Sequence, residues 1–274
     1  MRHRIFCRAR WHNKELMKET VAVVPTFIRN KNELDVTEKA INTLRETSNA
    51  FVCVVDDGSP FEGVHEALEA LGVDKLILKE KNEGFSHTVN HGLRFALENK
   101  TDAVLVNADI EFTNDEWLPA MEANEAGVVG ALLTYPNNII QHAGIYFSVI
   151  YRSFDHILRF APANISEAHK PRICPVTGAL QLIKYDTLKT VGLYDETFRL
   201  GWEDVAYCHD VFISEKECAY EPAATAIHHE SLFRGQNPSK QIKEWQQQSW
   251  HRLHERFKGH DFSDYVPTLL SWDD

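Results

Sequence analysis

A short apolar run that stops at polar residues constrains the fold more than any other feature of this chain. Residues 104–106 are Val-Leu-Val, a pattern typical of a strand buried on both faces of a parallel sheet. Asn107, Ala108 and Asp109 follow directly. Carboxylate and amide oxygens at the carboxyl end of such a strand lie where open α/β sheets bind ligands, and hard oxygen ligands suit Mg²⁺ or Mn²⁺. The same residues also fit a strand that merely ends in a solvated turn, so the rest of the sequence has to decide.

The composition is that of a globular chain with enough apolar residues for one large core, since 43% of the 274 residues are hydrophobic and 25% are charged. No apolar run approaches the roughly 20 residues that span a bilayer, and no signal-peptide pattern opens the sequence. The five cysteines are scattered, which indicates a reducing compartment and no disulfide framework. A net charge of −11 argues against a nucleic-acid binder. We therefore expect a cytoplasmic protein, with peripheral contact at the inner face of a membrane left open.

Apolar runs alternate with amphipathic segments through the first half of the chain. Strands are predicted at residues 21–24, 51–55, 76–78 and 104–106, and a helix follows each of them, the last beginning near Asn114. This alternation predicts the α/β class with a mostly parallel central sheet. The second half is less regular. Its predicted strands are 127–133, one or two within 139–150, 176–183 and 224–227, and its predicted helices are 185–191, one that opens with Glu203, and 241–257.

We divide the chain into three parts, which are a basic N-terminal extension at 1–20, a single domain at 21–232 and a C-terminal helical extension at 233–274. In the first part, six Arg and Lys residues outnumber two Glu residues. A solvated extension is favoured there over a basic arm that touches an anionic surface. Residues 152–172 lack clear periodicity, and a long loop of this kind is often functional and could close over a ligand.

Two predicted strands end in residues suited to a nucleotide base. The first ends at Pro25, where ladder pairing should stop, followed by Thr26 and Phe27. The second ends in an acidic turn that contains Asp57, whose carboxylate can accept the imide N–H of uracil or thymine or the N1–H of guanine. Adenine and cytosine lack a donor at that ring position. A plain turn is an equally good explanation of the motif when it stands alone, and Ser59 with Glu62 predicts a capping box that starts a helix at once.

Three further groups of polar residues lie at predicted element ends. Asn82 and Gly84 precede a helix, and Gly84 would let backbone approach a phosphate near the helix N-terminus. Glu203 and Asp204 open another helix, where carboxylates complement the dipole or serve as a catalytic base and an orienting group. His228 follows the last predicted strand, and a core histidine bonded to His229 or Glu230 is the alternative to a ligand there.

Taken together, the order of these motifs resembles that of family 2 glycosyltransferases, most closely the rhamnosyltransferase-type bacterial branch. The resemblance covers roughly residues 21 to 231. The matching segments are 24–26, 55–59, Asn82 with Gly84, 107–109, 177–179, 192–196, 203–205 and Pro222 with His228.

The resemblance implies a GT-A fold with one Rossmann-like domain, a UDP- or dTDP-linked sugar donor, Mn²⁺ or Mg²⁺, and inversion at the anomeric carbon. It implies hexosyl or deoxyhexosyl transfer to a glycan, lipid-linked or protein acceptor, in polysaccharide biosynthesis. Asp109 and His228 would hold the metal, and Asp204, with Glu203 as its rival, would be the base. The implied nucleotide-sugar contacts are Pro25, Thr26, Phe27, Asp57, Asn82, Gly84, Asn107, Ala108, Asp109 and Gly178.

Two positions depart from the family pattern. Asn107 replaces the first acid of the Asp-x-Asp motif, which removes a charge and weakens the expected metal affinity, and Ala206 stands where many relatives have a second Asp. The remaining groups suffice for the chemistry. Inverting transfer is one in-line displacement, so it needs one base and a means of stabilising the leaving diphosphate, and no carboxylate nucleophile.

Two other functions fit parts of the sequence. A nucleotidyltransferase shares the α/β plan and the metal, but the segment 25–30 has no glycine for a phosphate loop. A nucleotide-sugar-binding pseudoenzyme would explain Asn107, but Asp109, Asp204 and His228 argue against it.

Overall fold

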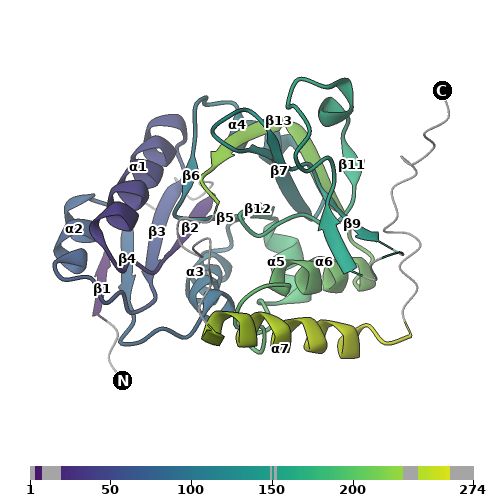
Figure 1. The fold of residues 1–274 in the computed structure, drawn as a ribbon. Helices are drawn as coiled ribbons and strands as arrows, with labels where there is room; N and C mark the ends of the chain where they lie inside the picture. Colours follow the sequence, from purple (N-terminus) through teal and green to yellow (C-terminus); the bar gives the residue numbers. More distant parts are fainter. Residues whose placement is uncertain (1–3, 8–19, 149, 151–152, 231–239, 260–274) are drawn as a thin grey trace.

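A large central sheet organises the molecule (Figure 1), in the strand order β1-β4-β3-β2-β5-β12-β7-β13-β11. The computed structural model describes residues 4–7, 20–148, 150, 153–230 and 240–259. The elements of the first half are β1 (Arg4–Cys7), β2 (Val21–Thr26), α1 (Lys31–Thr47), β3 (Phe51–Asp56), α2 (Val64–Ala70), β4 (Lys75–Leu78), α3 (Phe85–Asn99), β5 (Ala103–Val106), β6 (Ile110–Glu111) and α4 (Trp117–Ala123). The strands β4, β3, β2 and β5 are parallel neighbours, which confirms the predicted alternation.

The second half adds strands of both directions to this sheet. Its elements are β7 (Val128–Thr134), β8 (Ile140–His142), β9 (Ile145–Ser148), β10 (Ser153–His156), the 3₁₀ helix η2 (Ser166–His169), β11 (Arg172–Ile173), β12 (Leu180–Ile183), α5 (Tyr185–Val191), α6 (Glu203–Ile213), β13 (Cys218–His228) and α7 (Lys240–Arg256). β12 is antiparallel to both β5 and β7, whereas β13 is parallel to β7. β9 and β10 form a separate antiparallel pair.

Both faces of the sheet are covered by helices because successive strand residues point to opposite sides. On one face, Ala22 and Val24 of β2 belong to a buried cluster with side chains of α1, α2 and α4. On the other face, Val21 and Val23 belong to a cluster with side chains of α3, α5 and α6. The contact of α3 with β2 is close, since a Cβ added at Gly92 would lie 2.3 Å from a methyl carbon of Val23.

Several predicted boundaries were wrong, for physical reasons that the structure gives. Strand pairing was predicted to stop at Pro25. It has stopped by then on the β5 side, where the last paired residue is Val23, but on the β3 side β2 stays paired through Thr26. The predicted capping box does not form. The Ser59 hydroxyl bonds Asp56 and accepts from Ile28 N, so α2 begins only at Val64. β5 has one parallel and one antiparallel neighbour, although its residues are buried as predicted.

The irregular loop predicted at 152–172 contains β10, η2 and the start of β11. The last strand begins at Cys218, before the predicted 224, and a shift of register between Glu221 and Thr225 interrupts its pairing with β7. β12 is shorter than predicted, because residues 176–179 form no strand.

The two predicted extensions both contribute elements next to the central domain. β1 pairs antiparallel with β4, while residues 1–3 and 8–19 of the N-terminal extension lie outside the described part. Leu253 and Phe257, near the end of α7, are buried in a cluster with Phe198 and Val205, so α7 lies against α6 (Figure 1). Among the described residues, no helix has the length and apolar character needed to cross a membrane. Cys53, Cys174, Cys208 and Cys218 are buried free thiols.

Candidate active site

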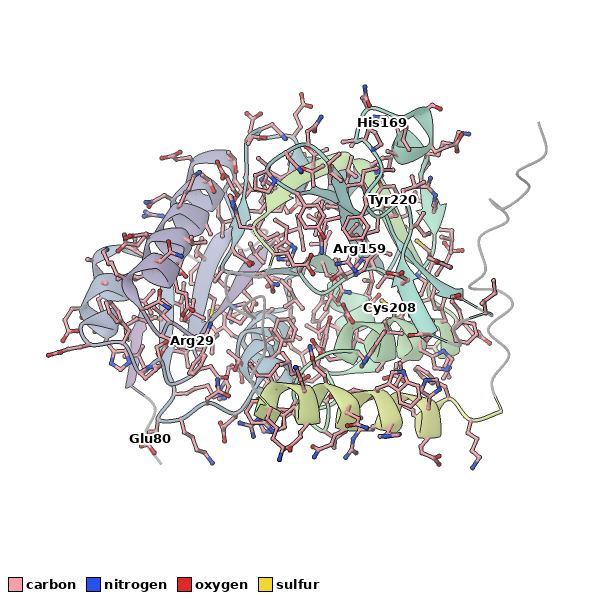
Figure 2. All side chains as sticks on the ribbon, in the orientation of Figure 1. Arg29, Glu80, Arg159, His169, Cys208 and Tyr220 are labelled. Carbon is pink, nitrogen blue, oxygen red and sulfur yellow. The ribbon has the colours of Figure 1, made fainter. Side chains whose placement is uncertain are left out.

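A cavity of about 760 Å³ opens where β2, β3 and β5 end, and every site residue predicted from the sequence lines it. Side chains from α6, α7 and β10 complete its wall, and Arg159, after β10, lies toward the middle of the molecule (Figure 2). The predicted residues in the wall are Pro25, Thr26, Phe27, Asp57, Asn82, Gly84, Asn107, Ala108, Asp109, Gly178, Glu203, Asp204 and His228.

At one end of the cavity, Asp57 is held by three donors. Its Oδ1 accepts from Lys79 Nζ at 2.5 Å and from Glu83 N at 2.9 Å, and its Oδ2 accepts from Gly84 N at 3.0 Å. The Lys79 ammonium also donates to Thr88 Oγ1 at 3.1 Å and is itself buried. A buried carboxylate is stable only with such compensation, so this ion pair fixes both Asp57 and the turn at 82–84.

Gly84 is required at this turn. Its φ is +98°, and a Cβ there would lie 2.6 Å from the carbonyl oxygen of Arg199, so both conformation and space exclude a side chain. Arg199 donates to the carbonyl oxygen of Asn82 at 3.2 Å, and its guanidinium lies over the ring of Trp245 on α7 at 4.1 Å. Helix α7 is thereby connected to the turn beside Asp57.

Thr26 also lines the cavity, but its hydroxyl is engaged within the protein. It donates to Asp56 Oδ1 at 3.1 Å, and Asp56 Oδ2 accepts from Ser59 N at 3.0 Å. Asp56 therefore organises the turn, while Asp57 faces the cavity. Any contact of Thr26 with a ligand has to use its methyl group or its backbone.

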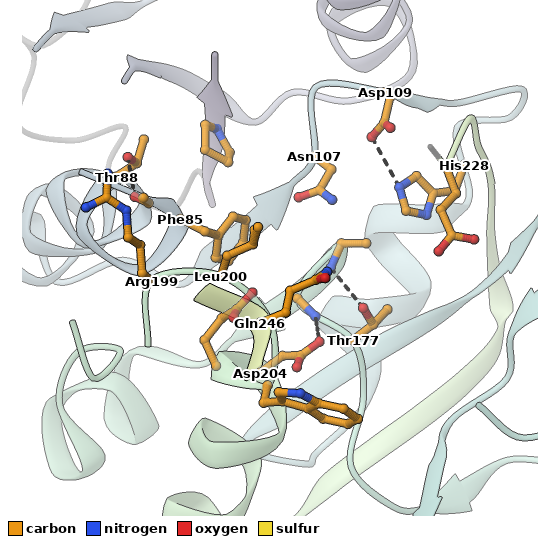
Figure 3. A pocket seen from close by; sticks show the side chains of 18 of the residues that line it. Phe85, Thr88, Asn107, Asp109, Thr177, Arg199, Leu200, Asp204, His228 and Gln246 are labelled. Atoms are coloured by element: carbon orange, nitrogen blue, oxygen red, sulfur yellow. Dashed lines mark hydrogen bonds and ion pairs between the residues drawn. The ribbon is translucent and has the colours of Figure 1, made fainter. Parts of the chain in front are cut away.

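Elsewhere in the cavity wall, Asp109 and His228 face each other (Figure 3), with His228 Nε2 3.2 Å from Asp109 Oδ1. Both are buried, and β6 pairs with β13 to bring their segments together. The His228 Nδ1 lies 3.2 Å from Gln141 Oε1. With that oxygen accepting, Nδ1 carries the proton and Nε2 presents a lone pair toward a carboxylate, the arrangement of a metal-ligating histidine. The His228 ring thus lies against Asp109 and Gln141, while His229 Nε2 lies 2.8 Å from Glu111 Oε2.

This donor set fits a divalent cation that a ligand helps to hold. In the described part of the chain, no cluster of three His, Cys, Asp or Glu side chains forms a complete protein cage. One carboxylate and one imidazole leave most positions of a six-coordinate Mn²⁺ or Mg²⁺ to substrate phosphates and water, the usual manner in which Mg²⁺ is bound. Asn107 lines the same part of the cavity with a neutral amide.

At the other end, Asp204 lies in the first turn of α6 (Figure 3), and its Oδ2 accepts from Gly178 N at 3.0 Å. Its Oδ1 accepts from Val205 N at 2.8 Å. Glu203 is only 6% exposed, whereas Asp204 is partly exposed to the cavity. Burial together with the nearby negative charge of Asp204 raises the pKa of Tyr194 well above its ordinary value, so this phenol stays neutral.

Some residues at the site were not predicted from the sequence. Lys79, which holds Asp57, follows directly on a predicted strand, and a lysine at that position is a signal that could have been used. Gln141, Arg199 and Trp245 line the cavity without a local signal, since only the tertiary fold brings them there. His156 and Arg159 also line it, and they belong to the loop 152–172 that was expected to be functional.

Comparisons with known proteins agree with this geometry. The model of the family described as glycosyl transferase family 2 matches residues 22–161. The chain is 25% identical over 271 residues to the uncharacterized protein y4gI of Sinorhizobium fredii. The match covers 92% of this chain, which spans only 29% of the length of that relative.

Among solved structures, a mannosyltransferase from Pyrobaculum calidifontis in complex with GDP-Man and Mn²⁺ has a TM-score of 0.56 at 16% identity, over 87% of this chain and 63% of that one. Glucosyl-3-phosphoglycerate synthase from Mycobacterium tuberculosis, in complex with Mn²⁺, UDP and glucosyl-3-phosphoglycerate, has a TM-score of 0.55 at 12% identity, over 87% and 80%. These likenesses show that the α/β fold of this chain is the GT-A fold, as the sequence predicted.

Proposed function

Because this chain belongs to glycosyl transferase family 2, we propose that it transfers a sugar from a nucleotide-diphospho-sugar to an acceptor hydroxyl, with inversion at the anomeric carbon. The observation that carries the proposal is one cavity lined by Asp57, by the Asp109–His228 pair and by Asp204. These groups match the three tasks of the reaction, which are base recognition, stabilisation of a leaving diphosphate and removal of a proton. The transferred sugar is a hexose or deoxyhexose, and the acceptor is a glycan, a lipid-linked molecule or a protein.

Asp57 recognises the base of a UDP- or dTDP-linked donor. Its Oδ2 accepts a hydrogen bond from Gly84 N at 3.0 Å, and a carboxylate oxygen has two lone-pair sites. The second site can accept the imide N–H of uracil or thymine. Asn82, Gly84, Pro25 and Phe27 line the wall around it.

Asp109 and His228 would hold Mn²⁺ or Mg²⁺. When bound, such a cation stabilises the negative charge of the departing diphosphate. Gln141 fixes the tautomer and the orientation of His228 through Nδ1 at 3.2 Å. Ala108 and Asn107 lie beside Asp109 and complete the wall along the diphosphate, with Asn107 as a neutral donor where relatives have an acid.

Asp204 is the general base. It lies in the first turn of α6, and Gly178 N–H orients one of its oxygens. The acceptor hydroxyl gives its proton to Asp204 while its oxygen attacks the anomeric carbon and the diphosphate leaves. One displacement needs one base, and no second carboxylate has to attack the sugar.

A thermal-shift panel tests this function, because a ligand that binds only the folded chain raises the apparent stability. We expect UDP or dTDP with Mn²⁺ to raise the melting temperature and ADP or CDP to leave it unchanged. Hydrolysis or transfer of the corresponding sugar nucleotides, in the presence of Mn²⁺ and after chelation, tests the reaction. Binding without any turnover would support the pseudoenzyme instead.

A further inference from the structure

Two histidines that the proposed reaction does not use lie in contact at the Asp204 end of the cavity. His142 ends β8, and His156 ends β10. Their Nδ1 atoms are 2.7 Å apart, and the two rings are nearly perpendicular, with an interplanar angle of 81°. His142 is completely buried, whereas His156 lines the cavity.

The hydrogen bonds of His142 determine where both rings carry their protons. The Nε2 of His142 accepts from Gly144 N at 3.3 Å and from Thr177 N at 3.4 Å, so the ring proton is on Nδ1. That Nδ1–H donates to His156 Nδ1, because one of two nitrogens at 2.7 Å has to donate and the other accept. The proton of His156 is therefore on Nε2.

Both rings are neutral in this arrangement. Burial lowers the pKa of His142 well below its ordinary value, and the neighbouring His156 and His228 lower it further. Burial also lowers the pKa of His156, an effect that the charge of Asp204 opposes and that of Arg159 reinforces. The fixed tautomer therefore persists at neutral pH, and Nε2–H of His156 is a donor.

The same histidine pair supports Asp204. His142 holds the backbone N–H of Thr177, and the next N–H, that of Gly178, binds Asp204 Oδ2 at 3.0 Å. His156 and Asp204 both line the cavity, and the charge of Asp204 acts on the His156 ring. Within the described residues, the only hydrogen bond of His156's ring is the one through Nδ1, so Nε2–H is left for a ligand.

We propose that His156 binds the acceptor, donating its Nε2–H to a second oxygen of the molecule whose hydroxyl faces Asp204. The acceptor class that fits is a polyhydroxylated one, a sugar or polyol with two neighbouring oxygens. His156 moves no proton in the reaction, so it is a binding residue that sets acceptor orientation. This proposal rests on the proposed function, because it takes Asp204 as the base.

The first test needs no turnover. Two-bond ¹⁵N–¹H correlation spectra of the uniformly ¹⁵N-labelled chain report the tautomer of each ring, and the His156 signal is identified by its loss in His156→Asn. We expect His142 as the Nδ1–H form and His156 as the Nε2–H form at pH 7. A proton on Nδ1 of His156 overturns the proposal.

The second test compares two amide substitutions. His156→Asn keeps an acceptor for His142 near the Nδ1 position but loses the donor at Nε2, whereas His156→Gln keeps an N–H at the Nε2 position. Glycerol serves as acceptor probe, with the most rapidly hydrolysed donor among UDP-glucose, UDP-galactose, UDP-N-acetylglucosamine and dTDP-rhamnose. The measured quantity is the ratio of transfer to glycerol over hydrolysis by water.

We expect His156→Asn to lower this ratio about 3- to 10-fold, the effect of one hydrogen bond, and His156→Gln to restore most of it. Affinity for UDP with Mn²⁺ should stay unchanged in both. An unchanged ratio in His156→Asn overturns the proposal while the proposed function stands. A wild-type chain that binds no UDP and hydrolyses no donor contradicts the proposed function, and the tautomer measurement then decides the arrangement of His156 separately.

Discussion

The two ends of the cavity each present an aspartate, but their surroundings differ. Asp57 is 4% exposed and accepts from a buried ammonium and two backbone N–H groups. Asp204 is partly exposed and accepts from the backbone N–H groups of Gly178 and Val205. The charge of Asp57 is thus neutralised by Lys79, whereas among the residues that the structure describes no ion pair neutralises that of Asp204.

This difference separates a binding carboxylate from a reactive one. A carboxylate fixed by a buried cation and two backbone N–H groups is a rigid hydrogen-bond acceptor, which suits recognition of a base. A carboxylate that is partly exposed to the cavity and held by neutral backbone donors is placed to take a proton from an acceptor hydroxyl. The predictions below challenge or refine this assignment of two roles to two aspartates.

The largest effect is expected at Asp204. Asp204→Asn keeps the size and most hydrogen bonds but removes the proton acceptor, so kcat should fall about 10²- to 10⁴-fold. The affinity for UDP with Mn²⁺ should not change, because Asp57 and Asp109 bind the nucleotide. Glu203→Gln is the matched control, since Glu203 is the neighbouring carboxylate on α6. Normal turnover in Asp204→Asn together with an inactive Glu203→Gln would assign the base to Glu203.

The Asp109–His228 pair lines the same cavity as the two aspartates and should show the next largest effect. Removal of a group that only supports a metal ligand typically costs 10- to 100-fold in metal affinity, so loss of a ligand itself should cost at least about 100-fold. We therefore expect Asp109→Ala to abolish the Mn²⁺-dependent part of UDP binding, measured by calorimetry, and His228→Ala to weaken it. EDTA should reproduce both effects in the unmodified chain. Full activity in EDTA would exclude a metal from the mechanism.

Elements of both halves could be predicted from the sequence where their signals are local. β5 is an apolar run, and α5 ends where Gly192, at φ +92°, can adopt a conformation that other residues avoid. The missed start of α2 has a partly tertiary cause, since the Ser59 hydroxyl accepts from the distant Ile28 N at 2.7 Å, besides bonding the nearby Asp56, and does not cap a helix. Local propensity cannot foresee that competition.

The residues of the candidate site likewise include some that local sequence signals predict and others that only the tertiary fold places. Asp57 and Asp109 follow apolar strands, so the α/β plan already places them at one sheet edge. His156 lies in a segment without periodicity, and only the antiparallel pairing of β9 with β10 places it opposite Ile145, three residues after His142. Trp245 reaches the cavity from a helix that we had assigned to a separate extension. The positions of His156 and Trp245 at the cavity could therefore not be predicted from their spacing in the sequence.

At Asp57 a smaller effect on binding is expected. A hydrogen bond to a charged group contributes about 1.5–3 kcal/mol, so Asp57→Ala should weaken UDP binding about 10- to 150-fold while changing kcat much less. This variant also removes the nearest carboxylate from the buried Lys79 ammonium and leaves it Glu83, at 3.4 Å, so the fold should be destabilised by up to about 3–5 kcal/mol.

The double variant Asp57→Ala with Lys79→Met separates these two consequences. It should regain stability in urea unfolding, because the buried ammonium is gone, but it should not regain UDP affinity. Recovery of both would mean that Asp57 acts only by holding the turn at 82–84. Equal affinity of the unmodified chain for ADP and UDP would contradict base recognition by Asp57.

The smallest effect is expected at Trp245, which connects α7 to the Asp57 end. Its ring lies under the guanidinium of Arg199 at 4.1 Å, and Arg199 in turn donates to the carbonyl oxygen of Asn82 at 3.2 Å. A partly exposed cation–π contact contributes about 0.5–1 kcal/mol, so Trp245→Ala should weaken UDP binding about 2- to 5-fold. Trp250→Ala is the control, since Trp250 lies on the same helix but outside the wall of the cavity. If the effect came from loss of α7 packing as a whole, both variants would lower the melting temperature and the UDP affinity alike. A change confined to Trp245→Ala would instead show that α7 acts on the nucleotide through Arg199 and the turn at 82–84, and would leave the Asp204 end unaffected.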